Sequence, residues 1–163
     1  MAGPAFDAET YRTWRTAAGL PRVDRALRDL YARLDAEVAS HEPVCRISGR
    51  CCRFREFGHR LYVTGLEIAW FLRQLPAEQH REPDAADPAG TCPYQLRGLC
   101  STHTIRPMGC RVFFCQPGSE DWQNELYEFY LAELRDLHDR EGLAYRYLDW
   151  IAGLEAAAEV TKR

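Results

Sequence analysis

Seven cysteines, all confined to residues 45–115 of a 163-residue chain, constrain the fold and chemistry more than any other feature. An odd number of cysteines cannot all pair within one chain, which argues against a disulfide framework. The first ten residues carry neither the basic stretch nor the apolar core of a secretory signal. We therefore expect a cytoplasmic protein whose reduced thiols serve metal binding or thiol chemistry.

Charge separates along the chain in parallel with the cysteines. Residues 1–43 have a net charge of −1, residues 44–115 of +4 and residues 116–163 of −6. A nucleic-acid surface usually needs a larger basic excess than this, so nucleic acid is not an expected partner. Arginines beside the cysteines can instead offset the negative charge that four thiolates leave around a divalent ion or a cluster.

Length and composition indicate a single domain, with 46% hydrophobic and 28% charged residues. No uncharged apolar run approaches the roughly 20 residues that cross a bilayer, so we expect no membrane partner. Residues 1–43 are predicted to form N-terminal helices, 44–117 a cysteine cluster region and 118–163 C-terminal helices. The predicted fold is therefore mainly α: one helical domain with an irregular, cysteine-rich, metal-binding middle and at most short strands.

Helix signals are clear in the first segment. Asp7 can cap a helix that ends near Gly19, and Pro21 opens a second helix. This second helix is predicted to end at residues 41–43, where a proline follows. Its apolar residues recur at helical spacing: Val23, Leu27, Leu30, Leu34 and Val38.

The last segment shows two further helices. Ser119 and the acidic residues after it indicate a helix start, and Gly142 a stop. A final helix is predicted from Tyr145 to Val160. The aromatic residues on these helices are interpreted as core packing rather than as a cofactor site.

The middle segment contains a strand and a buried helix. Residues 61–63 predict a short strand, after which Thr64 and Glu67 have the spacing of a capping box. The helix that follows is apolar around most of its circumference and ends at Pro76, so Glu67 is interpreted as a cap and not as a catalytic acid. Residues 77–90 are polar and contain proline and glycine, which predicts an exposed loop.

The candidate metal ligands form two groups, one before and one after this strand and helix. Because the strand, turn and helix reverse the chain, the groups can converge. The sequence has no paired C-x2-C motifs. The spacing of the cysteines alone therefore identifies neither the metal nor the four cysteines that bind it. The candidate ligands are all seven cysteines: Cys45, Cys51, Cys52, Cys92, Cys100, Cys110 and Cys115.

Neighbouring residues refine this site. If the backbone at Cys51 and Cys52 is extended, the two side chains point in opposite directions and serve two sites, or one thiol ligates while the other packs. Arg106 and Arg111 flank Cys110. These arginines either stabilise nearby thiolates and lower their pKa, or pair with carboxylates of the acidic C-terminal helix.

The histidines are weaker candidates. His103 or His59, a water molecule or Ser48 is needed if a second four-coordinate site exists, because seven thiols cannot complete two. His41 and His138 lie at predicted helix C-termini, where the helix dipole accounts for them. His80 is predicted to be solvated.

The cysteine motifs resemble those of the YkgJ-type cysteine cluster family, which is described as zinc- or iron-chelating. The family reads CxxCGxCC, then CP, a further cysteine and RPxxCR. Here the matching residues are 45–52, Cys92-Pro93 and 100–111. Two positions depart from the pattern: Ser48 replaces the second cysteine, and His103 replaces a usual tyrosine.

This resemblance implies a metal-binding protein, with zinc or an iron–sulfur cluster as the cofactor and a metal ion as the partner. A related motif in flagellin lysine methylases implies an alternative, an iron–sulfur-dependent enzyme or enzyme accessory in methyl transfer or redox chemistry. A metal-free thiol redox sensor is a third hypothesis. The sequence contains no catalytic motif, so it favours a binding protein over an enzyme and assigns no catalytic residue.

Overall fold

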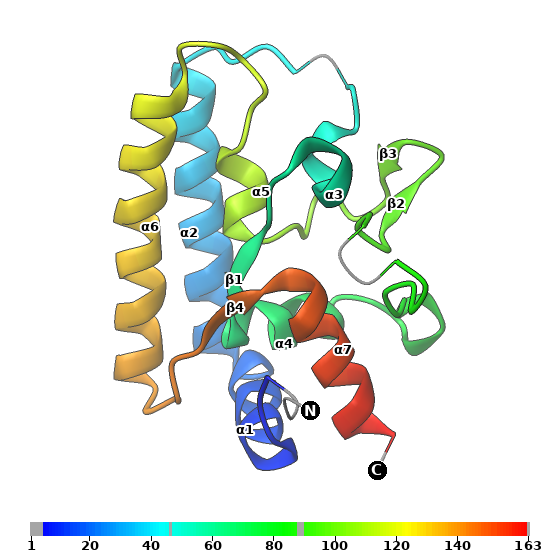
Figure 1. The fold of residues 1–163 in the computed structure, drawn as a ribbon. Coiled ribbons are helices and arrows are strands. Elements are labelled where there is room, and N and C mark those ends of the chain that lie inside the picture. The colour runs from blue at the N-terminus through cyan, green and yellow to red at the C-terminus, as the bar shows by residue number, and fades with distance from the viewer. Residues whose placement is uncertain (1–4, 46, 88–89, 163) are drawn as a thin grey trace.

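The computed structural model describes residues 5–45, 47–87 and 90–162 and is mainly α-helical (Figure 1). The α-helices are α1 (Ala8–Ala18), α2 (Pro21–Ser40), α3 (Phe54–Phe57), α4 (Gly65–Arg73), α5 (Met108–Val112), α6 (Glu120–Arg140) and α7 (Trp150–Thr161). The 3-10 helices are η1 (Arg50–Cys52) and η2 (Ala77–Gln79), and the strands are β1 (Tyr62–Thr64), β2 (Gln95–Leu96), β3 (Leu99–Cys100) and β4 (Tyr147–Asp149). Antiparallel pairs join β1 to β4 and β2 to β3. The predicted fold class is confirmed.

The N-terminal helices begin at the residues that the sequence indicates. Asp7 accepts a hydrogen bond of 2.7 Å from the backbone N–H of Thr10 and so caps α1. Pro21 is the first residue of α2, where its missing N–H costs nothing. Because α2 ends at Ser40 and the predicted end lies one to three residues further on, both helices are confirmed.

Helix α4 is the buried centre of the molecule. Thr64 and Glu67 form the predicted capping box, with the Glu67 carboxylate 2.9 Å from the Thr64 backbone N–H. Glu67 also accepts hydrogen bonds from the Tyr31 hydroxyl of α2 and the Met108 backbone N–H of α5. At Gly65, an added Cβ would meet the Trp14 ring at 2.3 Å, so a glycine is needed for α1 to pack this closely on α4.

The predicted final helix from Tyr145 to Val160 is wrong in its first part. Residues 147–149 form β4 and pair with β1 in the register Tyr62 with Asp149, and α7 begins only at Trp150. Asp149 ends the strand and caps the helix, since its carboxylate accepts from the Ala152 backbone N–H at 3.1 Å. Helical spacing of the apolar residues concealed a strand whose partner lies about 85 residues earlier in the sequence.

Two histidines differ from the sequence interpretation. His138 is fully buried: its Nδ1 donates to the Leu134 carbonyl at 2.8 Å and its Nε2 accepts from the Leu66 backbone N–H. Burial lowers the pKa of His138 and so disfavours its charged form. The prediction that a charged ring interacts with the helix dipole at this position is therefore wrong. His80 is exposed, yet its ring nitrogen lies 2.8 Å from the Leu72 carbonyl, which ties the exposed loop to the end of α4.

In Figure 1, α2 and α6 run side by side, while α3, β2 and β3 lie on the opposite side of α5. Residues 88 and 89 of the predicted exposed loop lie outside the described residues, and its described part contains the 3-10 helix η2.

None of the helices in the described part of the chain is long and apolar enough to span a membrane.

Candidate metal centre

The two cysteine groups meet where η1 contacts the segment around β2 and β3. The Cys92 backbone N–H donates to the Cys52 carbonyl at 2.7 Å. Gln95 of β2 donates through its side chain to the Gly49 carbonyl at 2.9 Å. Gly49 has a φ of +69°, and an added Cβ there would lie 2.6 Å from the Gln95 amide nitrogen, so this turn also requires glycine. The predicted convergence of the two groups is thus present in the backbone.

Cys52 lies at the centre of a group of four thiols, with Cys51, Cys92 and Cys100 around it. Its sulfur lies 3.9 Å from that of Cys51, and its thiol also interacts with those of Cys92 and Cys100. The expectation that Cys51 and Cys52 point in opposite directions assumed an extended backbone, whereas both lie in the 3-10 helix η1. This helical turn places vicinal side chains close enough to serve one site, and all four cysteines are free thiols.

The pKa values of these cysteines shift in opposite directions. Contacts with the Cys52 thiol lower the pKa of Cys51 to about 6 and that of Cys100 to about 5. Contact with Cys52 also lowers the pKa of Cys92, and the neighbouring sulfurs raise the pKa of Cys52. Cys110 lies further off, where burial raises its pKa and the other thiols add to the effect. Cys51, Cys92 and Cys100 therefore favour the thiolate more than Cys52 and Cys110 do.

Fixed hydrogen-bond donors support these thiolates. The indole N–H of Trp150 lies 3.3 Å from the Cys92 sulfur, and the Tyr94 backbone also donates to that sulfur. The Thr102 backbone and hydroxyl contact Cys100, with the hydroxyl 3.8 Å from the sulfur. Sequence reasoning missed Trp150, because its only local signal was an apolar position in a helix. These donors lower the cost of placing several negative sulfurs together.

Cys45 and Cys115 lie outside this group and are exposed. Their chain segments are nevertheless in contact, because the Val44 backbone N–H donates to the Gln116 side chain at 3.0 Å. The exposed Ser48 accepts from the Arg50 backbone N–H at 3.4 Å, which makes it a turn residue.

The two arginines that flank Cys110 have different surroundings. Arg106 favours the thiolate forms of Cys51 and Cys110, and its Nε is buried without a hydrogen-bond partner among the described residues. Arg111 instead pairs with Asp35 of α2 at 2.7 Å and donates to the carbonyls of the loop before α5. Pairing of Arg111 with the acidic C-terminal helix is therefore not observed. Arg111 fixes the backbone of this loop, whereas Arg106 acts on the thiols.

The histidine candidates lie at the edge of the group. His103 is exposed, but partial desolvation of its ring lowers its pKa, and it also interacts electrostatically with Arg106 and Cys100. The His59 ring lies 3.3 Å from the Cys51 carbonyl and stacks on Phe113. Both rings are thus near the thiols.

The donor chemistry fits a soft metal ion, although the side chains are not arranged around a common point. Within residues 5–45, 47–87 and 90–162, no group of three or more His, Cys, Asp or Glu side chains is positioned to hold an ion. The observed 3.9 Å between the sulfurs of Cys51 and Cys52 is nevertheless close to the spacing of two thiolates on tetrahedral zinc, about 3.8 Å for Zn–S bonds of about 2.3 Å. Metal binding therefore requires deprotonation and rotation of the other thiols.

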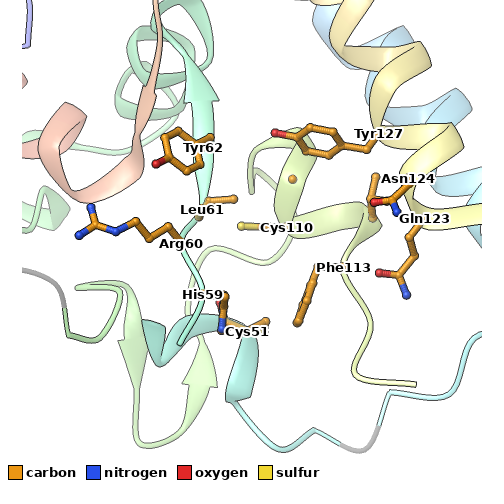
Figure 2. A pocket seen from close by; sticks show the side chains of 12 residues that line it. Cys51, His59, Arg60, Leu61, Tyr62, Cys110, Phe113, Gln123, Asn124 and Tyr127 are labelled. Atoms are coloured by element: carbon orange, nitrogen blue, oxygen red, sulfur yellow. The ribbon is translucent and has the colours of Figure 1, made fainter. Parts of the chain in front are cut away.

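A pocket of about 180 Å³ reaches this thiol group from the side of α5 and α6. Figure 2 shows the Cys110 sulfur between two aromatic pairs, with Tyr62 and Tyr127 on one side and Phe113 and His59 on the other. Cys51 lines the same pocket, but Cys52, Cys92 and Cys100 do not. One face of the thiol group is thus accessible to a small molecule.

Comparisons of this chain with family models, curated proteins and solved structures found no match. The resemblance to the YkgJ-type family therefore stays a prediction from the cysteine motifs. Assignment of a function depends on the geometry and chemistry of the thiols themselves.

Proposed function

We propose that this protein binds a metal through a thiolate site formed by Cys51, Cys52, Cys92 and Cys100. The observation that carries this proposal is the meeting of the two cysteine groups at Cys52, whose sulfur lies 3.9 Å from that of Cys51 and whose carbonyl accepts from the Cys92 backbone N–H at 2.7 Å. The lowered pKa values of Cys51, Cys92 and Cys100 favour thiolates, which suit a cation. A divalent ion replaces the remaining thiol protons, because thiolates and not thiols are metal ligands.

The surrounding groups support an anionic centre. Four thiolates and a divalent ion carry a charge of about −2, which the N–H groups at Cys92 and Cys100 and the Arg106 guanidinium stabilise. Cys45 and Cys115 stay outside the site in this proposal. Since free thiols persist in a reducing compartment, we place the protein in the cytoplasm.

Two metal centres fit the donors. The compact pair of Cys51 and Cys52 favours a single tetrahedral ion, zinc above all. An iron–sulfur cluster is favoured by a different observation: the Nε–H of Arg106, a half-buried side chain that acts on the thiols, is itself buried and has no hydrogen-bond partner among the described residues. Inorganic sulfides of a cluster accept such a hydrogen bond, and Cys110 is then a further candidate ligand.

The test is the metal content of protein purified without oxygen. We expect about one equivalent of zinc in a colourless protein, or iron and acid-labile sulfide in a brown one. Cys52→Ser should lose most of this metal, since Cys52 contacts the other three thiols. Cys115→Ser is the matched control, because the same change at an exposed thiol outside the site should leave the metal content unchanged.

A metal-free thiol redox sensor is the second candidate function. It is favoured by the lowered pKa of Cys51, about 6, at a residue that is exposed. If anaerobic protein holds neither zinc nor iron at near-stoichiometric amounts, the metal proposal fails. Rapid alkylation of Cys51, faster than that of Cys115, then supports the sensor.

A further inference from the structure

Two adjoining pockets lie between α1, the end of α4 and α7. The first, of about 340 Å³, is formed mainly by α1 and the C-terminal end of α7. The second, of about 380 Å³, also includes the loop that contains η2. Both are lined by Tyr11, Arg15, Arg73 and Thr161, so the two pockets form one cleft. In Figure 1, α1 and α7 lie at the end of the molecule away from β2 and β3, and no cysteine is among the described residues that line the cleft.

The first pocket is positively charged. Arg12 and Arg15 of α1 and Arg73 of α4 line it, and no carboxylate is among its described lining residues. None of these three arginines takes part in an ion pair within the described part of the chain. The acidic residues of α7, Glu155 and Glu159, line a different pocket. Three unpaired guanidinium groups in a chain whose net charge is −3 form a local field that attracts an anion.

Neighbouring groups position two of these arginines. The guanidinium carbon of Arg15 lies 5.9 Å from the centroid of the Tyr11 ring. Arg73 lies against the C-terminal end of α1, since a Cβ added at Gly19 would be 2.8 Å from its Nη2. The partial negative charge of a helix C-terminus favours a guanidinium there. Asp24 attracts Arg73 electrostatically, but no ion pair joins these two described residues. Both guanidinium groups therefore keep N–H donors for a ligand.

The second pocket is less charged and has an apolar wall. Leu72 and Leu154 line it and are buried. Its one described carboxylate, that of Glu82, pairs with Lys162 at 2.7 Å, so these two charges offset each other. Arg81 leaves one further positive charge at this end of the cleft. The cleft thus offers cations at one end and an apolar surface beside them.

We infer that this cleft binds a small organic phosphate, whose phosphate group lies among Arg12, Arg15 and Arg73 and whose uncharged body lies in the second pocket. A phosphate monoester carries a charge of about −1.5 to −2 at pH 7, more than a carboxylate can offer to three cations. The planar guanidinium also matches two phosphate oxygens at once. Each pocket has a volume within the range of roughly 300–1,000 Å³ that small-molecule sites occupy. This inference does not rest on the proposed metal site.

The experiment compares phenyl phosphate with benzoate and phenol, which present the same ring with a smaller charge or with none. Calorimetry at a salt concentration of about 0.15 M gives the affinities. Phenyl phosphate should bind about tenfold more tightly than benzoate, and phenol should bind more weakly still. Equal affinities for phenyl phosphate and benzoate overturn the inference.

A second arm separates a small ligand from a lipid with the same phosphate group. Vesicles that contain phosphatidic acid are mixed with the protein and sedimented. Binding of these vesicles without binding of phenyl phosphate would assign the phosphate to a membrane surface and overturn the inference.

One variant tests the location. Arg15→Gln removes an exposed cation that lines both pockets and should weaken phenyl phosphate binding by about tenfold or more. Arg25→Gln is the matched control, because it removes an exposed arginine of α2 that lines neither pocket. Equal affinities in the two variants would overturn the inference. Removal of the metal with a chelator should leave the affinity for phenyl phosphate unchanged, so a failure of the metal proposal is distinguishable from a failure of this one.

Discussion

The helical scaffold (α1, α2, α4, α6 and α7) and the thiol region (residues 49–56 and 90–106) are stabilised in different ways. The scaffold buries large apolar side chains completely, among them Trp14, Leu27 and Leu134. In the thiol region few side chains are buried, and Leu99 is 56% exposed. Apolar burial is the main source of folding free energy, so a segment with little of it depends on other contacts. The scaffold therefore has a large core of its own, and if the proposed metal binds, we expect it to order the thiol region.

The largest effect is expected in the scaffold. Leu27→Ala removes a side chain that is fully buried in α2 and should lower the free energy of unfolding by about 2–5 kcal/mol. Chemical denaturation followed by circular dichroism measures this loss. The metal content per folded molecule should stay unchanged, and a parallel loss of metal would show that the two regions are not separate.

Glu67 joins α4 to α2 and to α5, the helix that carries Cys110, and should give the next largest effect. Its two carboxylate oxygens accept hydrogen bonds from Thr64, from Tyr31 and from the Met108 backbone N–H, which precedes Cys110 by two residues. Glu67→Gln places an N–H₂ group where only acceptors fit and should cost about 1–3 kcal/mol. Denaturation of this variant measures the cost. A stability equal to that of the parent protein would contradict the described hydrogen bonds.

Mild acid should weaken the scaffold through His138. Burial lowers its pKa in the folded protein below the ordinary 6.5, so the unfolded chain binds the proton more readily. The stability is therefore complete above about pH 6.5 and falls as the pH decreases below it, by at most about 1.4 kcal/mol per pH unit for one proton. His138→Gln should flatten this part of the pH profile. An unchanged slope in that variant would assign the acid sensitivity to other groups, the thiols included.

The smallest effect is expected at Ser48. Its side chain is exposed and accepts one long hydrogen bond within a turn, so Ser48→Cys should change the stability by less than about 0.5 kcal/mol. Metal stoichiometry and retention against a chelator should equal those of the parent protein. A higher stoichiometry would extend the thiol region to residues 45–48 and support a second site.

Local signals predicted the scaffold well. Asp7 and Thr64 mark helix starts through hydrogen bonds to residues three positions away, and Pro21 does so through its own ring, which fixes φ and removes the N–H. Strand β4 was missed because its partner β1 lies far away in the sequence, and helical apolar spacing continues through it. Tertiary pairing overrode the local pattern there.

The thiol region was predictable in composition but not in geometry. The motifs identified the cysteines and their convergence, yet the 3-10 turn that brings Cys51 and Cys52 to one site depends on Gly49 packing against Gln95. The contact of Trp150 with Cys92 joins residues 58 positions apart and has no sequence signature. The sequence likewise does not show that Cys45 and Cys115 are exposed and lie outside the thiol group; this follows only from the structure.

Hydrogen exchange before and after metal removal tests the difference between the two regions most directly. The informative amides are those of Phe54, Cys92 and Ser101, which donate to Gly90, Cys52 and Tyr94 within the thiol region. After chelation we expect these amides to exchange much faster, while the amides of α2 and α6 keep their protection. Unchanged protection of the thiol region, or an equal loss of protection in α2 and α6, would contradict the proposal that a metal orders one region and apolar burial the other.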